Sequence, residues 1–463
     1  MKTDSTHALQ LIEKILTKEI EFLSKEEADF LLDHRDVCTR KLLPILALEI
    51  TQIKADENWS FNTLSGCLKL LAGFEENRAF DWVIQLHDFP EVLEDENSCF
   101  ILRYWADLLI ATISSEWYKL KQFIEDSEVD SEIREACLEA LVLLVVRERL
   151  DRSVVVEYFN SLYSKILSGE LEDPELVMLL LESSLCIWPG DSMEEIRELF
   201  GFDLVDEDFV DLLDVLNAYD EGKEECLEDV NSWVTNSHLY DFFKRDEEIE
   251  EDSLEYDLEE SEYLDDEEIE HLKEVEKDVR ILFPNFEIKG LSAEEQKKHQ
   301  SLPQLLLEDP EQALEIAGEL LTAHFDIPIL LYSFYLILTI LEDKVAAMQV
   351  LKKWIEKFPN DLLGKIEYAH YFLRRGEPEK AEALFSSTWS LAALYPERES
   401  FHEIECLKFF HLIGCYFLQI GEIEKAQEQA QILDATNPRS FECYHLQKKI
   451  ALRLREDSFI EDL

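Results

Sequence analysis

Apolar residues recur along most of this chain at the spacing of an amphipathic helix. In the segment 133–144, apolar side chains fall at 133, 136/137, 140/141 and 144, on one face of a 3.6-residue helix. The same spacing recurs through the first half and stops at glycine or proline, for example at Gly73 and Gly169. It predicts helices over 6–23, 25–34, 38–53, 59–73, 76–87, 97–112, 115–125, 131–148, 151–167, 174–187, 191–200, 206–218 and 221–233.

Short breaks between these helices, without any strand-like alternation, predict an all-α fold. Many helices of similar length joined in this way are typical of an α-solenoid built from HEAT-like helical pairs. The composition agrees, because 463 residues include only 12 Gly and 12 Pro. So few turn residues argue against an all-β fold and against glycine-rich phosphate loops.

The last third contains the clearest internal repeat. Within 411–426, Gly414 fits the small position of a first helix, and Gly421 fits the turn to a second helix. Ala426 then allows close approach of the second helix, and Pro438 ends the unit, as in a tetratricopeptide-like repeat. An earlier copy has the matching residues Ala369, Phe372, Gly376, Ala381 and Phe385, and a degenerate third has Tyr335, Leu338, Ala347, Leu351 and Pro359. We expect 292–325, with Pro310 starting its second helix, to cap this stack.

The repeat frame also predicts which side chains face inward. They combine two basic residues, two histidines and a glutamine, a combination able to bind a peptide carboxylate by charge-assisted hydrogen bonds. These predicted groove positions are His370, Arg374, Lys408, His411 and Gln419. The alternative interpretation is that they are ordinary solvated helix faces.

A strongly acidic segment separates the two halves. Residues 246–270 contain 16 acidic and no basic residues, yet apolar and aromatic residues are interleaved among them. One interpretation is a solvated linker that runs into a docking helix. The other is a recognition segment that orders on a basic partner, or occupies the peptide groove of its own chain; its residues are Tyr256, Leu258, Tyr263, Asp265 and Asp266. The predicted organisation is a HEAT-like domain over 1–240, the acidic linker over 241–278 and a tetratricopeptide-like domain over 279–463.

Net charge narrows the possible partners. With 44 Lys+Arg against 103 Asp+Glu, the formal charge is −59. A surface this negative repels phosphate backbones, so we expect no nucleic-acid binding. If charge selects a protein partner, we expect that partner to be basic. The longest uncharged run, 327–341, is too short to span a bilayer, which needs about 20 residues. The N-terminus lacks the apolar core of a signal peptide, so we expect a cytoplasmic protein, with signal-less export still open.

No motif in the sequence indicates catalysis. Phosphate-binding loops and the nucleophile elbow of hydrolases are absent, and the nine cysteines form no C-x-x-C pair. The stretch from His402 to Cys406 begins like a zincin helix, but a cysteine replaces its second histidine. Residues 265–268 lack the glycine and ligand spacing of an EF-hand. We therefore expect no metal, no cofactor and no enzymatic activity.

The first ~240 residues resemble a bacterial domain family of unassigned function that is built of HEAT-like helical pairs. The resemblance rests on the order and spacing of four short pieces, 42–46, 70–79, 136–141 and 204–206. It implies a fold and not a reaction. Where the family has a Gly-Asp pair, this chain reads Leu-Glu-Asp-Glu-Asn-Ser over 93–98, and it lacks the cysteine-rich metal knuckle with which some relatives end.

Three functional hypotheses follow from these features. The first is a non-catalytic scaffold or adaptor for protein partners. The second is an acidic chaperone or inhibitor that shields a basic protein. The third is an enzyme with a site that no motif reveals, for which His402, His411 and Cys415 are the candidate residues.

Overall fold

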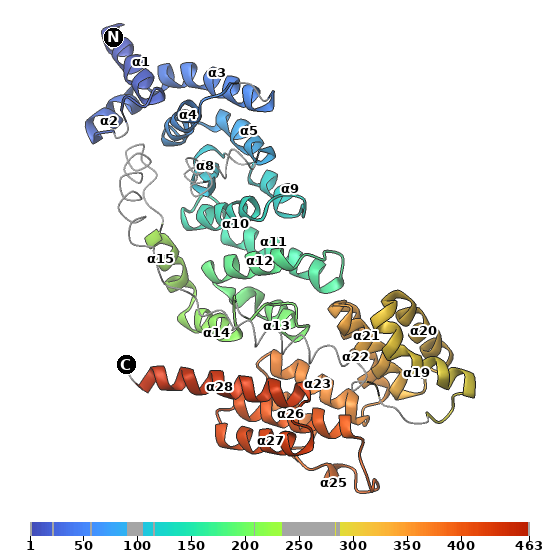
Figure 1. The fold of residues 1–463 in the computed structure, drawn as a ribbon. Helices are drawn as coiled ribbons and strands as arrows, with labels where there is room; N and C mark the ends of the chain where they lie inside the picture. Colours follow the sequence, from blue (N-terminus) through green and yellow to red (C-terminus); the bar gives the residue numbers. More distant parts are fainter. Residues whose placement is uncertain are drawn as a thin grey trace. The chain divides into compact units, whose positions relative to one another are not determined.

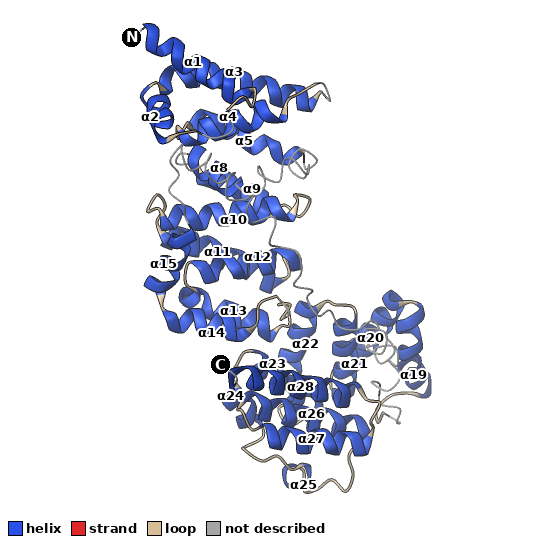
Figure 2. Ribbon diagram, turned by 60° about the vertical axis from the view of Figure 1, so that its left-hand side comes forward, coloured by secondary structure: helices blue, strands red, loops and turns tan. Residues whose placement is uncertain are grey.

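The computed structural model describes residues 2–20, 23–55, 58–89, 105–113, 116–207, 209–233, 283 and 288–461. Throughout these ranges every regular element is an α-helix or a 3-10 helix, and Figure 2 draws no strand among them. The predicted all-α class is confirmed. The acidic segment and the helix expected to follow it lie outside the described residues.

The described residues form two compact units. The first contains the residues up to 163, then 172–193 and 209–233. The second contains 164–171, 194–207 and the residues from 283 onward. Two short segments of the first half of the sequence therefore pack with the C-terminal half, a feature that no pattern in the sequence indicates. The predicted boundary at 240/241 falls outside the described residues.

In the first unit, consecutive helices pack on one another (Figure 1). Helix α3 packs on α4, α4 on α8, α8 on α10, and α10 on both α12 and α15, as in an α-solenoid. The α-helices of this unit are α1 (Lys2–Leu16), α2 (Lys25–Asp33), α3 (Arg35–Lys54), α4 (Phe61–Gly73), α5 (Phe80–Val83), α8 (Trp105–Thr112), α9 (Lys121–Ile124), α10 (Ser131–Val146), α11 (Arg152–Ser168, which ends in the second unit), α12 (Pro174–Cys186), α14 (Leu212–Glu221) and α15 (Lys223–Trp233).

Local capping explains where several of these helices begin and end. Ser24 and Glu27 form a capping box at the start of α2, and Asp211 and Asp214 form another at α14. The second box places the start of α14 at Leu212, six residues after the predicted start at 206. The helix predicted over 76–87 is instead a short α-helix, α5, between two 3-10 helices, Asn77–Ala79 and Ile84–Asp88.

The second unit is a series of antiparallel helical pairs. Helices α19 and α20, α21 and α22, α23 and α24, and α26 and α27 pair along the chain, and α28 packs on both α26 and α27. The α-helices of this unit are α13 (Met193–Gly201), α19 (Ala293–Glu308), α20 (Pro310–Ala323), α21 (Pro328–Ile340), α22 (Lys344–Lys357), α23 (Leu362–Arg374), α24 (Pro378–Leu384), α25 (Leu391–Leu394), α26 (Glu403–Gln419), α27 (Ile423–Thr436) and α28 (Phe441–Glu461). As predicted, Pro310 starts a helix; Asp309 accepts a hydrogen bond at its N-cap.

Small residues hold the last pairs together. A Cβ atom built on Gly414 would lie 2.3 Å from Cδ2 of Leu446, so α26 and α28 approach too closely for any side chain there. Gly421 has φ +78° at the turn between α26 and α27, a conformation that favours glycine. Ala426 is fully buried in the α27 interface. These three residues have the packing roles that the repeat pattern predicts, while the tetratricopeptide-like assignment stays a prediction.

Candidate functional site

Three histidines lie in line across three adjacent helices of the second unit. His370 is on α23, His411 on α26 and His445 on α28, and α26 packs against both of the other helices. Neighbouring ring centroids are 5.1 and 5.0 Å apart. Nδ1 of His411 lies 3.4 Å from Nε2 of His370, and Nε2 of His411 lies 2.8 Å from Nδ1 of His445.

A thiol joins this row of rings. Cys415 lies one turn after His411 on α26, and its Sγ is 3.6 Å from Nε2 of His411. We call His370, His411, Cys415 and His445 the imidazole–thiol cluster. His411 is 7% exposed and the other three are half-buried, so the cluster is largely shielded from water.

Burial sets the charge state of the cluster. It lowers the pKa of His370 and His411 well below 6.5, and the positive charges of Arg374 and the neighbouring histidines add to the effect. Burial and the nearby Lys449 lower the pKa of His445 to about 4. Burial raises the pKa of the Cys415 thiol to about 11. At neutral pH the cluster therefore consists of neutral imidazoles and a neutral thiol.

A buried ion pair lies on the same helices. Nζ of Lys408 on α26 is 2.6 Å from a carboxylate oxygen of Glu367 on α23, and the hydroxyl of Tyr335 donates to the same carboxylate at 3.3 Å. Burial alone would lower the pKa of Lys408, but the Glu367 carboxylate outweighs it and raises that pKa. The positive charge of Lys408 is therefore balanced within the protein.

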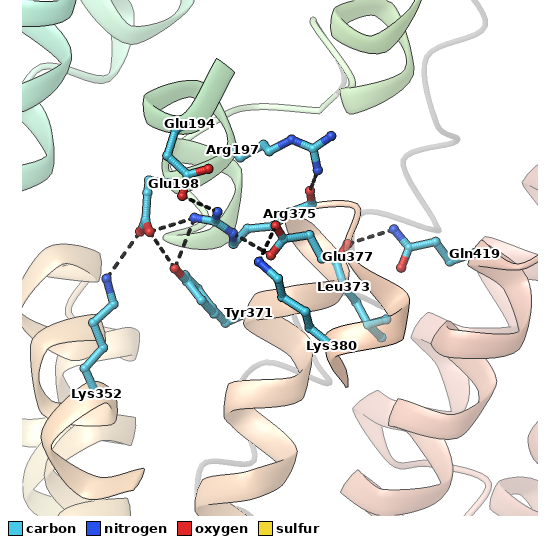
Figure 3. Close-up of polar contacts among 10 residues, drawn as sticks. All are labelled: Glu194, Arg197, Glu198, Lys352, Tyr371, Leu373, Arg375, Glu377, Lys380 and Gln419. Atoms are coloured by element: carbon cyan, nitrogen blue, oxygen red, sulfur yellow. Dashed lines mark hydrogen bonds and ion pairs between the residues drawn. The ribbon is translucent and has the colours of Figure 1, made fainter. Parts of the chain in front are cut away.

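Arg374 and Gln419 contact backbone carbonyls. Nε and Nη2 of Arg374 lie 3.2 and 3.0 Å from the carbonyl oxygen of Gly201, at the C-terminus of α13, where a cation complements the helix dipole. Nε2 of Gln419 donates to the carbonyl of Leu373 at 2.8 Å (Figure 3). The five predicted groove residues thus lie on two adjacent helices, and all five have partners inside the chain, which limits the charge that a ligand would meet.

Next to Arg374, Arg375 is the centre of a polar network (Figure 3). Its guanidinium lies 2.7 Å from Glu194, 2.6 Å from Glu198 and 3.0 Å from Glu377. Its Nη1 also donates to the hydroxyl of Tyr371, which in turn donates to Glu198 at 2.7 Å. Burial opposes the charge of Arg375, yet the carboxylates hold its pKa above the usual value.

Sequence reasoning missed two members of these arrangements. His445 lies 34 residues after His411, which is the tetratricopeptide repeat length, so the repeat offset itself could have indicated it. Arg375 carries no such signal, because its partners Glu194 and Glu198 lie about 180 residues earlier in the chain. His402, considered above as a metal ligand, caps α26 by accepting from the amide of Ile404.

The residues predicted as an acidic recognition segment, from Tyr256 to Asp266, lie outside the described residues. The described cysteines are all free thiols. No helix within the described ranges is long and apolar enough to cross a membrane.

The fold defines an all-helical, α-solenoid class of protein. The model of the family described as "Protein of unknown function (DUF1186)" matches residues 9–255, more than half of the chain, and the protein belongs to that family. This match confirms that the first part of the chain belongs to a family of unassigned function, as its resemblance predicted.

Two similar proteins come from Chlamydia, and both are described only as an uncharacterized protein. The chain is 26% identical over 165 residues to one from Chlamydia muridarum and to one from Chlamydia trachomatis serovar D. The aligned region covers 35% of this chain, and 65% and 64% of these two relatives. No solved structure matches the chain significantly.

Proposed function

We propose that this protein is a non-catalytic scaffold or adaptor that binds protein partners, of bacterial type and acting in the cytoplasm. The observation that carries the proposal is a pair of large apolar side chains left in water at the start of α14. Phe209 is 74% exposed and Leu213 is 55% exposed. Large apolar groups exposed on a folded surface commonly serve as anchors for another protein.

The chemistry around these two residues indicates the kind of partner. Asp211 lies between the two apolar residues in the sequence, Asp214 directly follows Leu213, and both aspartates are exposed. A partner that fits would offer an apolar pocket with basic residues at its rim, which agrees with the net charge of −59. Nucleic acid does not fit, because its phosphates would meet acidic side chains.

The helical architecture supports the same role. Stacked helical pairs, here of HEAT-like and tetratricopeptide-like type, expose long faces on which a partner can lie. The predicted peptide groove of α23 and α26 is a second such surface. Its free charge is small because Lys408 is paired with Glu367 and Arg374 binds the Gly201 carbonyl.

Affinity capture with the tagged full-length chain tests the scaffold proposal. We expect a defined partner to survive a wash at about 0.5 M salt, since apolar anchors are not screened. The double variant Phe209→Ser/Leu213→Ser should lose that partner. Leu307→Ser should keep it, because Leu307 on α19 is similarly exposed, at 50%, but belongs to the other unit. Equal capture by all three proteins would contradict the assignment of this surface, and a turnover measured with the purified chain would contradict the non-catalytic role.

The second candidate function is an acidic chaperone or inhibitor of a basic protein, and the charge of −59 favours it. Its binding would consist of exposed charge pairs, so it should fall steeply between low salt and about 0.5 M. The double variant Phe209→Ser/Leu213→Ser should then bind as well as the parent chain. The same experiment therefore separates the two functions.

A further inference from the structure

The imidazole–thiol cluster contains the donor atoms of a metal site. One ligand atom from each of His370, His411 and Cys415 lies within 4.8 Å of the other two. An ion bonded at about 2.0–2.1 Å to nitrogen and about 2.3 Å to sulfur keeps its ligand atoms roughly 3.3–3.8 Å apart. Nδ1 of His411 is already 3.4 Å from Nε2 of His370, close to that spacing, whereas Sγ of Cys415 lies 3.6 Å from the other nitrogen of the His411 ring and would have to move toward an ion bound at Nδ1. We propose that His370, His411 and Cys415 bind one thiophilic d10 metal ion, Zn²⁺ or Cu⁺.

The scaffold around the donors is rigid and close-packed. His411 and Cys415 are one turn apart on α26, so both side chains emerge on the same face of the helix. His370 comes from the adjacent α23, and Gly414, beside Cys415, brings α28 into close contact with α26. Donors on packed helices are held in place better than donors on loops, which reduces the entropy lost on binding.

His445 completes the surroundings of the donors. A histidine binds a metal through one ring nitrogen, and its other nitrogen usually has a hydrogen-bond partner that fixes the ring. Nδ1 of His445 lies 2.8 Å from Nε2 of His411, so it has this role when the ion binds Nδ1 of His411. His445 is therefore a positioning residue in the proposal, while three side chains are ligands and one coordination position stays open.

The charges near the cluster are compatible with a cation. Lys408 is neutralised by Glu367, and Arg374 is engaged by the carbonyl of Gly201. Burial raises the pKa of the Cys415 thiol and Lys449 offsets only part of that rise, so the thiolate that a metal requires forms as the metal binds. Binding is a proton exchange without any redox step: the Cys415 S–H bond breaks, a sulfur–metal bond forms, and the proton leaves to solvent.

The donor types restrict the ion. Thiolate together with imidazole suits Zn²⁺ and Cu⁺, whereas Mg²⁺ and Ca²⁺ prefer oxygen ligands.

Metal titration of the full-length chain, reduced and freed of metal with a chelator, tests this site. Zn²⁺ is followed by calorimetry, Cu⁺ by competition with a chromogenic chelator under anaerobic conditions, and Co²⁺ by the sulfur-to-cobalt charge-transfer absorption that only thiolate ligation produces. We expect one ion per chain and a charge-transfer band. The ion that binds more tightly in competition identifies which of the two the site prefers. No binding of any of the three ions by the parent chain would overturn the proposal.

Matched variants separate this site from adventitious binding to an acidic surface. Cys415→Ser should abolish the charge-transfer band and weaken Zn²⁺ binding by about 100-fold or more, and His370→Gln should weaken it comparably. His445→Gln should keep the band but weaken binding by about 10- to 100-fold. Cys406→Ser is the control, because Cys406 lies on the same helix outside the cluster. A band or an affinity that Cys415→Ser leaves equal to Cys406→Ser would overturn the proposal, and circular dichroism verifies that each variant is folded.

Discussion

Nη1 of Arg375 lies 2.6 Å from a carboxylate oxygen of Glu198, and the arginine is only 2% exposed (Figure 3). The two residues belong to α13 and to the end of α23, so this ion pair joins an early segment to the C-terminal helices within one compact unit. Burying the arginine without its carboxylates would cost much free energy of folding, and so would burying the carboxylates without the arginine. The network is therefore a sensitive point of the second unit.

Replacing Arg375 should destabilise the second unit strongly. Arg375→Met removes the buried cation that Glu198 and Glu377 share and leaves them only the more exposed lysines Lys352 and Lys380, at a cost of about 3–5 kcal/mol. Lys380→Met is the control: its side chain is 56% exposed and pairs with Glu377 at the surface, so the loss should stay below about 1 kcal/mol. Urea unfolding followed by circular dichroism measures both. Similar losses for the two variants would contradict this account of the network.

The first unit has a comparable buried pair. Nη2 of Arg134 on α10 lies 2.5 Å from Asp173, and the two side chains are 1% and 7% exposed. Asp173 also caps α12 by accepting from the amide of Leu176 at 2.9 Å. Arg134→Met should therefore cost about 3–5 kcal/mol in the free energy of unfolding. Glu175→Gln, which alters an exposed carboxylate 3.7 Å from the same arginine, should cost less than about 1 kcal/mol; a larger effect of Glu175→Gln would refute this ranking.

His299 should make the second unit acid-sensitive. Burial lowers its pKa from 6.5 to about 4. The Ser333 hydroxyl donates its own proton to the Ile329 carbonyl, so Nε2 of His299 is the donor in the 2.8 Å hydrogen bond between His299 and Ser333. Because the folded pKa is the lower one, the unfolded chain binds more protons as the pH falls below about 6.5. The contribution of His299 to the free energy of unfolding is therefore fully present above that pH and is lost as the pH falls toward 4. Between pH 7 and 5 the loss is about 2 kcal/mol.

The variant His299→Gln isolates this effect, because glutamine can still donate to Ser333 and does not titrate. Its free energy of unfolding should fall less than that of the parent chain between pH 7 and 5, by about the same 2 kcal/mol. Chemical denaturation at the two pH values measures the difference. Parallel pH profiles for the two proteins would show that His299 is not the group responsible.

Gly414 should tolerate no side chain while Leu446 faces it. Gly414→Ala places a Cβ within 2.3 Å of Cδ2 of Leu446, a fully buried side chain, so overpacking should cost about 1–3 kcal/mol. The double variant Gly414→Ala/Leu446→Ala removes the clash, and its loss should be smaller than the sum of the two single losses. Thermal unfolding of the four proteins measures this coupling. Strict additivity would mean that the two residues do not interact.

Helix positions were largely predictable from the sequence because each helix has a local signal. The apolar spacing over 131–148 corresponds to α10, and 174–187 corresponds to α12, whose start is marked by Asp173 and Pro174. The helix predicted over 6–23 ends at Leu16, where Lys18 adopts a left-handed conformation with φ +58°. No residue pattern marks a lysine for that conformation, so this end was not predictable.

The repeat pattern also located much of the candidate site. His370 and His411 occupy inward-facing positions of successive predicted repeats, one helical turn apart in the repeat frame, so the stacking of like helices brings them near each other. That Lys408 meets Glu367, and that Arg374 meets the Gly201 carbonyl, depends on which residues face each other across helices. Such pairings are set by packing and carry no local signal.

The sequence by itself determined the helical class, the positions of most helices and the small residues at helix contacts, because apolar periodicity and capping are local physical effects. Only the tertiary structure decided that residues 194–207 pack with the C-terminal unit, and that Arg375 is buried among carboxylates from distant segments. It also decided that three imidazoles and a thiol converge. These features depend on the burial of surface between helices far apart in the chain, and no local pattern records which surfaces will meet.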